Sequence, residues 1–215
     1  MGDRLLGNLL CYNRLRIGTD GKGVTTLVAM HGCPLNCKYC INKDLYGLPV
    51  KHCSIEQLYE KMLVDDLYFS YTGGGVCFGG HEPLLQTDFI KEFILYVRSK
   101  DKPWKFTVET SLNVGKGSLE KLLDYIDCWV IDIKSMNADI YKSYTGVSNE
   151  KVIGNLRVIA DQVHKGNVFI RIPRIKDFTI ERDILNSVND LKSMGFQEES
   201  LEVFDYVLSD LGGQQ

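Results

Sequence analysis

Short runs of apolar and β-branched residues alternate along the chain with segments in which apolar residues recur at helical spacing. The runs predict strands over about residues 25–30, 76–78, 105–110, 128–133, 168–172 and 201–206. The periodic segments predict helices over about residues 55–69, 88–97, 118–126, 149–164 and 181–195. Because almost every strand is followed by a helix, the pattern indicates parallel strands joined by right-handed crossovers.

Polar residues gather where the predicted strands end. They lie in the loop 31–42, Gly79–Glu82, Glu109–Ser111, Asp132–Lys134, Arg171–Arg174 and Asp205–Tyr206. In a barrel these ends converge on one rim, whereas a doubly wound sheet uses only those near its switch point. We therefore predict an α/β fold, an open partial (β/α)6 barrel of parallel strands. Residues 1–215 are expected to form a single domain with a flexible tail at 208–215.

The composition narrows the class of protein. The chain has 215 residues, is 44% apolar and carries a net charge of −3, so it can bury a core and has no electrostatic pull toward nucleic acid or an anionic membrane. The N-terminal residues lack a signal-peptide pattern, and no apolar run is long enough for a membrane span. The seven cysteines form no even disulfide framework, which favours a reducing compartment. We expect a cytoplasmic protein that binds neither nucleic acid nor membrane.

Three cysteines lie close together in the loop 31–42, which follows the first predicted strand. Cys33, Cys37 and Cys40 are spaced C-x3-C-x2-C. Thiolates are the ligands of iron–sulfur clusters, and a 4Fe–4S cluster held by three of them keeps one iron open for a non-protein ligand. A Cys3His zinc site that uses His31 or His52 is the alternative. Zinc sites usually bring a second ligand pair, which is missing from this sequence.

This stretch, with Tyr39 before its last cysteine, resembles the cluster loop of radical S-adenosylmethionine (SAM) enzymes. The resemblance implies two cofactors, a 4Fe–4S cluster and SAM. It further implies that one electron from the reduced cluster cleaves SAM to methionine and a 5′-deoxyadenosyl radical, which then takes a hydrogen atom from a substrate.

Further segments resemble the glycyl-radical-enzyme activating enzymes, of the pyruvate formate-lyase activating type. They are Asp20–Gly23 (similar to DGPG), Gly73–Val76 followed by Gly79–Pro83 and Gln86 (GGGV and GGEP-x-LQ), Asp132–Asn137 (DLK-x-MN) and Gly146–Asn149 (GVSN). The resemblance implies an anaerobic oxidoreductase that abstracts hydrogen from a glycine Cα of a partner glycyl-radical enzyme or peptide substrate. It also implies a flavodoxin- or ferredoxin-type electron donor.

The resemblance assigns roles to individual residues. It assigns the metal cluster to Cys33, Cys37 and Cys40. It assigns SAM binding to Tyr39, Cys40, Ile41, Gly80, His81, Glu82, Glu109, Thr110, Asp132 and Lys134.

A cation and a substrate complete the expected site. The resemblance implies a monovalent cation beside SAM, bound by Glu109, Thr110 and Asp132, and it places the substrate next to Asp20. Arg171, in the fifth predicted strand, is a second candidate for substrate binding because a guanidinium binds peptide carbonyls and carboxylates.

Among the departures from the family pattern, two bear on the proposed activity. His81 replaces the second glycine of the GGE turn, and Val207 replaces a histidine near the adenine. These changes motivate an alternative, a radical SAM enzyme that modifies a ribosomal peptide or a small molecule. A non-catalytic iron–sulfur or zinc protein on the same fold is the other alternative. The remaining cysteines are scattered and are expected to be buried structural thiols: Cys11, Cys53, Cys77 and Cys128.

Overall fold

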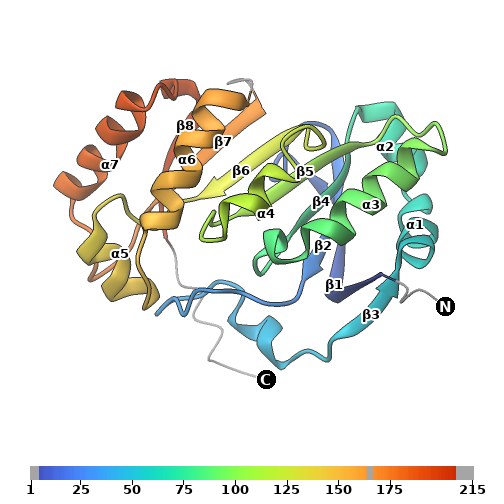
Figure 1. Ribbon diagram of the computed structural model, residues 1–215, viewed down its shortest axis with the longest axis horizontal. Helices are drawn as coiled ribbons and strands as arrows, with labels where there is room; N and C mark the ends of the chain where they lie inside the picture. The colour runs from blue at the N-terminus through green and yellow to red at the C-terminus, as the bar shows by residue number, and fades with distance from the viewer. Residues whose placement is uncertain (1–4, 164–166, 207–215) are drawn as a thin grey trace.

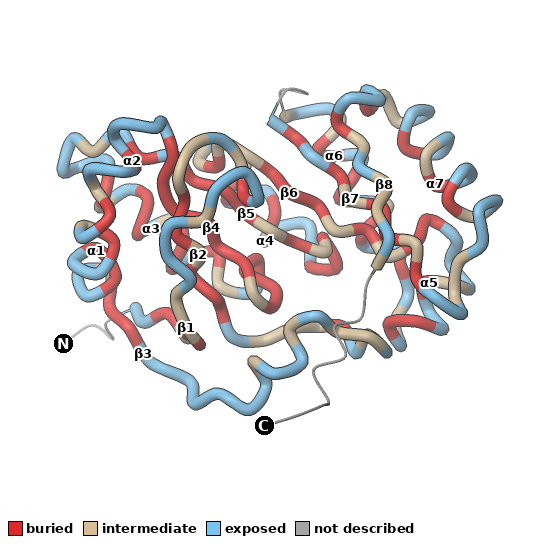
Figure 2. The backbone as a smooth tube through the Cα atoms, turned by 180° about the vertical axis from the view of Figure 1, so that it is seen from behind, coloured by how far each residue is buried: buried red, intermediate tan, exposed pale blue. Residues whose placement is uncertain are grey.

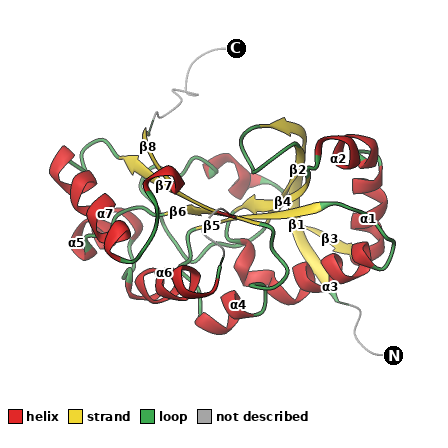
Figure 3. Ribbon diagram, turned by 90° about the horizontal axis from the view of Figure 1, so that it is seen from above, coloured by secondary structure: helices red, strands yellow, loops and turns green. Residues whose placement is uncertain are grey.

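The protein is built on one eight-stranded sheet with helices packed along one face (Figures 1 and 3). The computed structural model describes residues 5–163 and 167–206. The strand order is β3-β1-β2-β4-β5-β6-β7-β8. β1 pairs antiparallel with β2 and β3, and every pairing from β2 to β8 is parallel. The predicted succession of parallel strands in an open α/β fold is therefore confirmed, with an antiparallel edge added to it.

The elements have the following bounds. The strands are β1 (Leu6–Ile17), β2 (Val24–Met30), β3 (Lys51–Ser54), β4 (Gly75–Gly80), β5 (Lys105–Thr110), β6 (Cys128–Asp132), β7 (Val168–Arg174) and β8 (Leu201–Asp205). The α-helices are α1 (Ile55–Leu63), α2 (Asp66–Thr72), α3 (Thr87–Arg98), α4 (Lys116–Glu120), α5 (Ala138–Thr145), α6 (Glu150–Gln162) and α7 (Glu181–Ser193). Short 3-10 helices cover Lys43–Gly47, Pro83–Gln86 and Glu198–Ser200.

The core lies between the sheet and the helices. The buried stripe of α3 includes Phe93, whose ring meets Phe78 of β4 and Phe106 of β5 edge to face at 5.8 and 6.3 Å. Figure 2 shows that buried residues run the length of the central strands. Successive residues of a strand point to opposite faces. Because Phe78 and Phe106 face the helices, Cys77 and Thr107 face the opposite, concave side of the sheet.

The antiparallel edge was not predicted from the sequence. β1 has twelve residues, but its register against β2 shifts twice, and Leu15 within it has a positive φ of 56°. These irregularities break the period-two alternation by which strands are predicted. β3 has only four residues, two of them exposed, so it carries little apolar signal.

The single helix predicted over residues 55–69 is wrong. The capping box that begins it is confirmed, since the Ser54 hydroxyl accepts from the Gln57 N–H at 3.3 Å and the Gln57 side chain accepts from the Ser54 N–H at 2.9 Å. The helix then breaks at Asp65, whose buried side chain accepts from Arg14 Nη2 at 2.6 Å and from Thr26 Oγ1 at 2.7 Å. Tertiary bonds to β1 and β2 therefore override local helix propensity.

Other differences are smaller. The helix predicted over residues 118–126 is the short α4, which begins before Ser118 and ends at Glu120. α5 was not predicted; its N-cap, Asn137, accepts from two backbone N–H groups through its side chain. The predicted helix end at residues 164–166 and the tail 208–215 lie outside the described residues.

A buried carboxylate in this fold provides a test of its packing. Burial raises the pKa of Asp65, but the bonds from Arg14 and Thr26 lower it further, and the net pKa lies below its ordinary value. We expect Asp65→Asn to reduce the free energy of unfolding by about 1–3 kcal/mol at pH 7, since the neutral amide loses the ion pair with Arg14 and keeps only one acceptor oxygen for the donors of Arg14 and Thr26. Because the pKa of Asp65 is lower in the folded than in the unfolded state, its ionised carboxylate stabilises the fold at pH values above the unfolded-state pKa. This stabilisation is lost as the pH falls through the folded-state pKa. The difference in free energy of unfolding between wild type and variant should therefore shrink below pH about 4.

Urea unfolding of the wild type and the variant at neutral and acidic pH checks this. Asp124→Asn, at an exposed position, is the matched control. Equal stability of the two variants at pH 7 would contradict the role assigned to Asp65.

Candidate active site

The cysteine loop, residues 31–42, is fixed from three sides. At its first residue, the His31 N–H donates to the Asn8 carbonyl of β1 at 2.9 Å. In its middle, the Asn36 N–H donates to the Thr145 carbonyl at the end of α5, also at 2.9 Å. Farther along, the Tyr39 carbonyl accepts from the hydroxyls of Tyr144 and Tyr206 at 2.8 and 2.5 Å. The loop is therefore held by β1, α5 and the end of β8 together.

A cleft lies between this loop and the carboxyl ends of the parallel strands. Its empty volume is about 630 Å³. All of the residues predicted to bind the cluster or SAM line it: Cys33, Cys37, Cys40, Tyr39, Ile41, Gly80, His81, Glu82, Glu109, Thr110, Asp132 and Lys134. Residues from distant parts of the chain thus meet in one place, as expected of strand ends on one rim.

Six more residues line the cleft without having been assigned a role from the sequence. They are Leu35, Asn42, Tyr46, Ser111, Tyr144 and Tyr206. Asn42 belongs to the predicted cysteine loop, and Tyr206 belongs to the predicted end of the last strand. Nothing in the sequence marks Tyr46 or Tyr144, because each reaches the cleft through a 3-10 helix or an α-helix that was not predicted.

The three loop cysteines suit an iron–sulfur cluster. All are free thiols and half-buried. Burial raises the pKa of Cys33 to about 11 and also raises the pKa of Cys37, against which the ammonium of Lys134 acts. Metal binding displaces the thiol protons. Three soft ligands on one loop, with Lys134 beside them to offset negative charge, therefore fit the cluster predicted from the sequence.

The zinc alternative fits less well. His52 is exposed on β3 and contacts Asn8 at 2.8 Å, and neither it nor His31 lines the cleft. Of the other cysteines, Cys53 and Cys77 are buried as expected, whereas Cys11 and Cys128 are only half-buried.

The Gly79–Glu82 turn at the end of β4 is hydrogen-bonded to the cysteine loop. Gly80 has a φ of +83°, and a Cβ there would lie 2.8 Å from the Ala29 Cβ, so this position requires glycine. His81 is not among the residues with positive φ, and its backbone accepts a side chain without strain. The Glu82 N–H donates to the Gly32 carbonyl at 2.8 Å, and the Asn42 side-chain amide donates to the Gly80 carbonyl.

Glu82 is the most completely bonded carboxylate of the cleft. It is 1% exposed and accepts from the hydroxyls of Thr110 and Ser111 at 2.6 Å each, and from the N–H groups of Ser111 and Leu84 at 2.9 and 3.2 Å. Burial raises the pKa of Glu82 despite these donors. Both of its oxygens already have protein partners, so Glu82 stabilises the packing of the turn against the end of β5.

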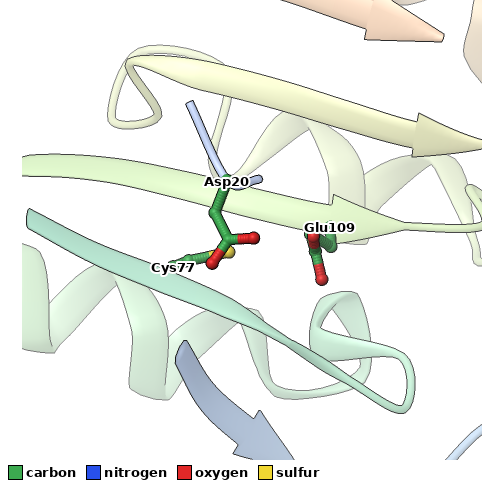
Figure 4. Close-up of side chains that lie close together, drawn as sticks. All are labelled: Asp20, Cys77 and Glu109. Atoms are coloured by element: carbon green, nitrogen blue, oxygen red, sulfur yellow. The ribbon is translucent and has the colours of Figure 1, made fainter. Parts of the chain in front are cut away.

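Beneath the cleft, Asp20, Cys77 and Glu109 lie within 4.8 Å of one another on the concave side of the sheet (Figure 4). Both carboxylates already have cationic partners: Asp20 Oδ2 lies 2.6 Å from Arg16 Nε, and Glu109 Oε1 lies 3.3 Å from Arg171 Nη1. Burial and the neighbouring carboxylates raise the pKa of Glu109 to about 7. Guanidinium groups therefore neutralise this cluster, which we call the charged floor.

Of the two residues predicted to bind substrate, Asp20 belongs to this charged floor and Arg171 is paired with its Glu109; neither lines the cleft. Asp20 is 1% exposed, and Arg171 also donates to the Thr19 carbonyl at 2.5 Å. At the predicted cation site, the Thr110 hydroxyl is bonded to Glu82 and Glu109 faces Arg171. A cation there remains a prediction.

Residues 27–190 of the chain match the radical SAM superfamily. The chain belongs to this superfamily. Radical SAM proteins use a 4Fe–4S cluster and SAM, the two cofactors predicted from the cysteine loop.

Curated proteins similar to this chain include activating enzymes. The chain is 33% identical over 196 residues to (2S)-3-sulfopropanediol dehydratase activating enzyme of Klebsiella oxytoca. This alignment covers 90% of this chain and 56% of the relative. It is 36% identical over 128 residues to pyruvate formate-lyase-activating enzyme of Clostridium pasteurianum. This alignment covers 59% of this chain and 52% of the relative. The chain thus spans about half the length of these two relatives.

Two solved structures with bound S-adenosylmethionine share the fold. Streptococcus suis SuiB bound to S-adenosylmethionine superposes with a TM-score of 0.60 at 17% identity, over 81% of this chain and 38% of SuiB. The protein anSMEcpe with bound AdoMet gives a TM-score of 0.60 at 15% identity, over 82% of this chain and 49% of its own. At these identities the likeness concerns the fold, and it confirms the predicted partial barrel.

The bonding of Glu82 leads to a stability prediction. In Glu82→Gln an amide NH2 replaces one acceptor oxygen and faces N–H and O–H donors, so we expect the free energy of unfolding to fall by about 2–3 kcal/mol. Urea unfolding measures this, with the exposed Glu92→Gln on α3 as the control. Wild-type stability in Glu82→Gln would show that the turn does not depend on the carboxylate.

Proposed function

We propose that this protein is a glycyl-radical-enzyme activating enzyme, which abstracts a hydrogen atom from a glycine Cα of a partner enzyme. The observation that carries the proposal is the 33% identity to an activating enzyme over 90% of this chain. The meeting of the cysteine loop with the Gly79–Glu82 turn and the Asp132–Lys134 strand end supports it. When bound, the cluster and SAM supply an electron and a 5′-deoxyadenosyl radical.

We assign the cluster to Cys33, Cys37 and Cys40. All three thiols line the cleft, and no other cysteine among the described residues does. Lys134 stays protonated beside them: burial lowers its pKa, but Asp132 and Cys37 raise it, and the net pKa lies above its ordinary value. A fixed positive charge beside the loop offsets the negative charge of three thiolates.

We assign the opposite wall of the cleft to SAM. Gly80 leaves its backbone free of a side chain, and the Asn42 amide orients its carbonyl. Asp132 and Lys134 offer a carboxylate and an ammonium, which complement the charged amino acid end of SAM. Ile41, which is 77% exposed, lines the cleft and offers an apolar surface for the adenine.

The substrate is the least constrained part of the proposal. A glycine fits because its Cα carries no side chain that would keep it from the cleft. Asp20 and Arg171 would contact a substrate only by exchanging their bonds to Arg16 and Glu109. We keep them as candidate substrate-binding residues at the charged floor.

We propose a flavodoxin- or ferredoxin-type electron donor. The exposed Lys38 and Lys43 line a groove together with Cys37 and Cys40, on the outer side of the cysteine loop. An acidic donor would be attracted to this groove and would come close to the cluster. The seven cysteines are all free thiols, which suits the reducing cytoplasm. In the described part of the chain, no helix is long and apolar enough to cross a membrane.

The radical chemistry is tested first. The protein reconstituted anaerobically with iron and sulfide, reduced, and given SAM should release 5′-deoxyadenosine. Cys37→Ala should reduce the product to the level without enzyme, because a ligand of the cluster is lost. Cys128→Ala, in which the changed thiol lies away from the cleft, should retain product. Zinc without sulfide in the purified protein, or product from Cys37→Ala, would contradict the assignment.

The substrate class is tested next. Incubation with the glycyl-radical enzyme encoded nearest to this gene should give an electron spin resonance doublet from a glycine radical, and a partner with that glycine changed to alanine should give none. If 5′-deoxyadenosine forms but no such partner acquires a radical, the activating role fails. A precursor peptide whose mass changes in the same assay would then favour the peptide-modifying alternative.

A further inference from the structure

His81 places a buried nitrogen with no partner at the edge of the cleft. The residue is 9% exposed, and its Nε2 has no hydrogen-bond partner among the described residues. The other ring nitrogen, Nδ1, accepts from the Gly32 N–H at 3.2 Å. Burying a polar atom without a hydrogen-bond partner costs free energy. Its presence here therefore points to a bound group that supplies the missing partner.

The ring is held in one orientation and one tautomer. A nitrogen that accepts a hydrogen bond carries no proton, so in the neutral ring the proton is on Nε2. Burial and the neighbouring His31 lower the pKa of His81 more than the backbone of Asn42 raises it, which keeps the ring neutral. Tyr46 stacks on it with ring centroids 4.3 Å apart and an interplanar angle of 30°. The Nε2–H is therefore a fixed donor.

His81 lines the cleft together with Cys33, Cys37 and Cys40. Gly32, which orients the ring, directly precedes Cys33 in the chain. Tyr46, which stacks on the ring, lines the same cleft as Cys33. The contacts of His81 thus lie on both sides of the proposed cluster ligands.

We propose that His81 Nε2–H donates a hydrogen bond to a sulfur of the 4Fe–4S cluster and thereby raises the reduction potential of the cluster. The inference rests on the proposed cluster ligands. Hydrogen bonds to the sulfurs are one of the determinants of iron–sulfur potentials. A donor stabilises the reduced, more negative cluster more than the oxidised one, so the potential rises. His81 is in this role a positioning and tuning residue.

The test measures the cluster without SAM and without substrate. Redox titration followed by electron spin resonance should give a lower potential in His81→Phe, which keeps a ring for Tyr46 but has no N–H. His81→Gly, which removes the donor by a different route, should shift the potential in the same direction. His81→Gln keeps an N–H donor, so its potential should lie near that of the wild type.

A second measurement uses the wild type and does not depend on any variant. In the reduced protein, electron–nuclear double resonance in H2O and D2O should detect an exchangeable proton coupled to the cluster, and this proton should be absent in His81→Phe. An unchanged potential in both His81→Phe and His81→Gly overturns the inference. A coupled proton that arises only after SAM is added also overturns it and assigns the donor to SAM. Cluster binding that survives in Cys37→Ala is a different result, which refutes the proposed ligands themselves.

Discussion

The buried charge of Glu82 is the constraint on which the cleft depends. A carboxylate removed from water needs donors on both oxygens, and these come from Thr110, Ser111 and the turn itself. The end of β4 and the end of β5 therefore cannot move apart without exposing a charge to an apolar interior. Because the Glu82 N–H also bonds Gly32, the same constraint reaches the cysteine loop. One side chain thus couples the two walls between which the cofactors would lie.

The charged floor explains why the fold carries an antiparallel edge. Burying Asp20 and Glu109 near each other is unfavourable unless cations accompany them. Arg171 comes from within the parallel sheet, but Arg16 comes from β1. The β1–β2 ribbon therefore supplies half of the positive charge that the concave face needs. A sheet of parallel strands alone would leave Asp20 without its partner.

The sequence allows prediction of the parts of this protein that repeat a local pattern. The parallel strands are apolar runs, and the cysteine spacing and glycine turns stand in contiguous segments, so both are recognisable without a structure. β1, the break at Asp65 and the cleft residues Tyr46 and Tyr144 are not, because each depends on contacts between residues far apart in the chain. The ion pair between Asp20 and Arg16 was missed for the same reason: sequence shows the charge of a residue but not which partner neutralises it.

The bond between Tyr206 and Tyr39 has a consequence for how the protein is made. The two residues are separated by 167 positions, and the cysteine loop lies near the start of the chain. At about 5–20 residues per second, the loop leaves the ribosome roughly 10–30 seconds before the strand that helps to hold it. During that interval its thiols lack one of their three anchors. We expect iron and sulfide to be inserted after synthesis, into a finished fold, and not while the chain is still growing.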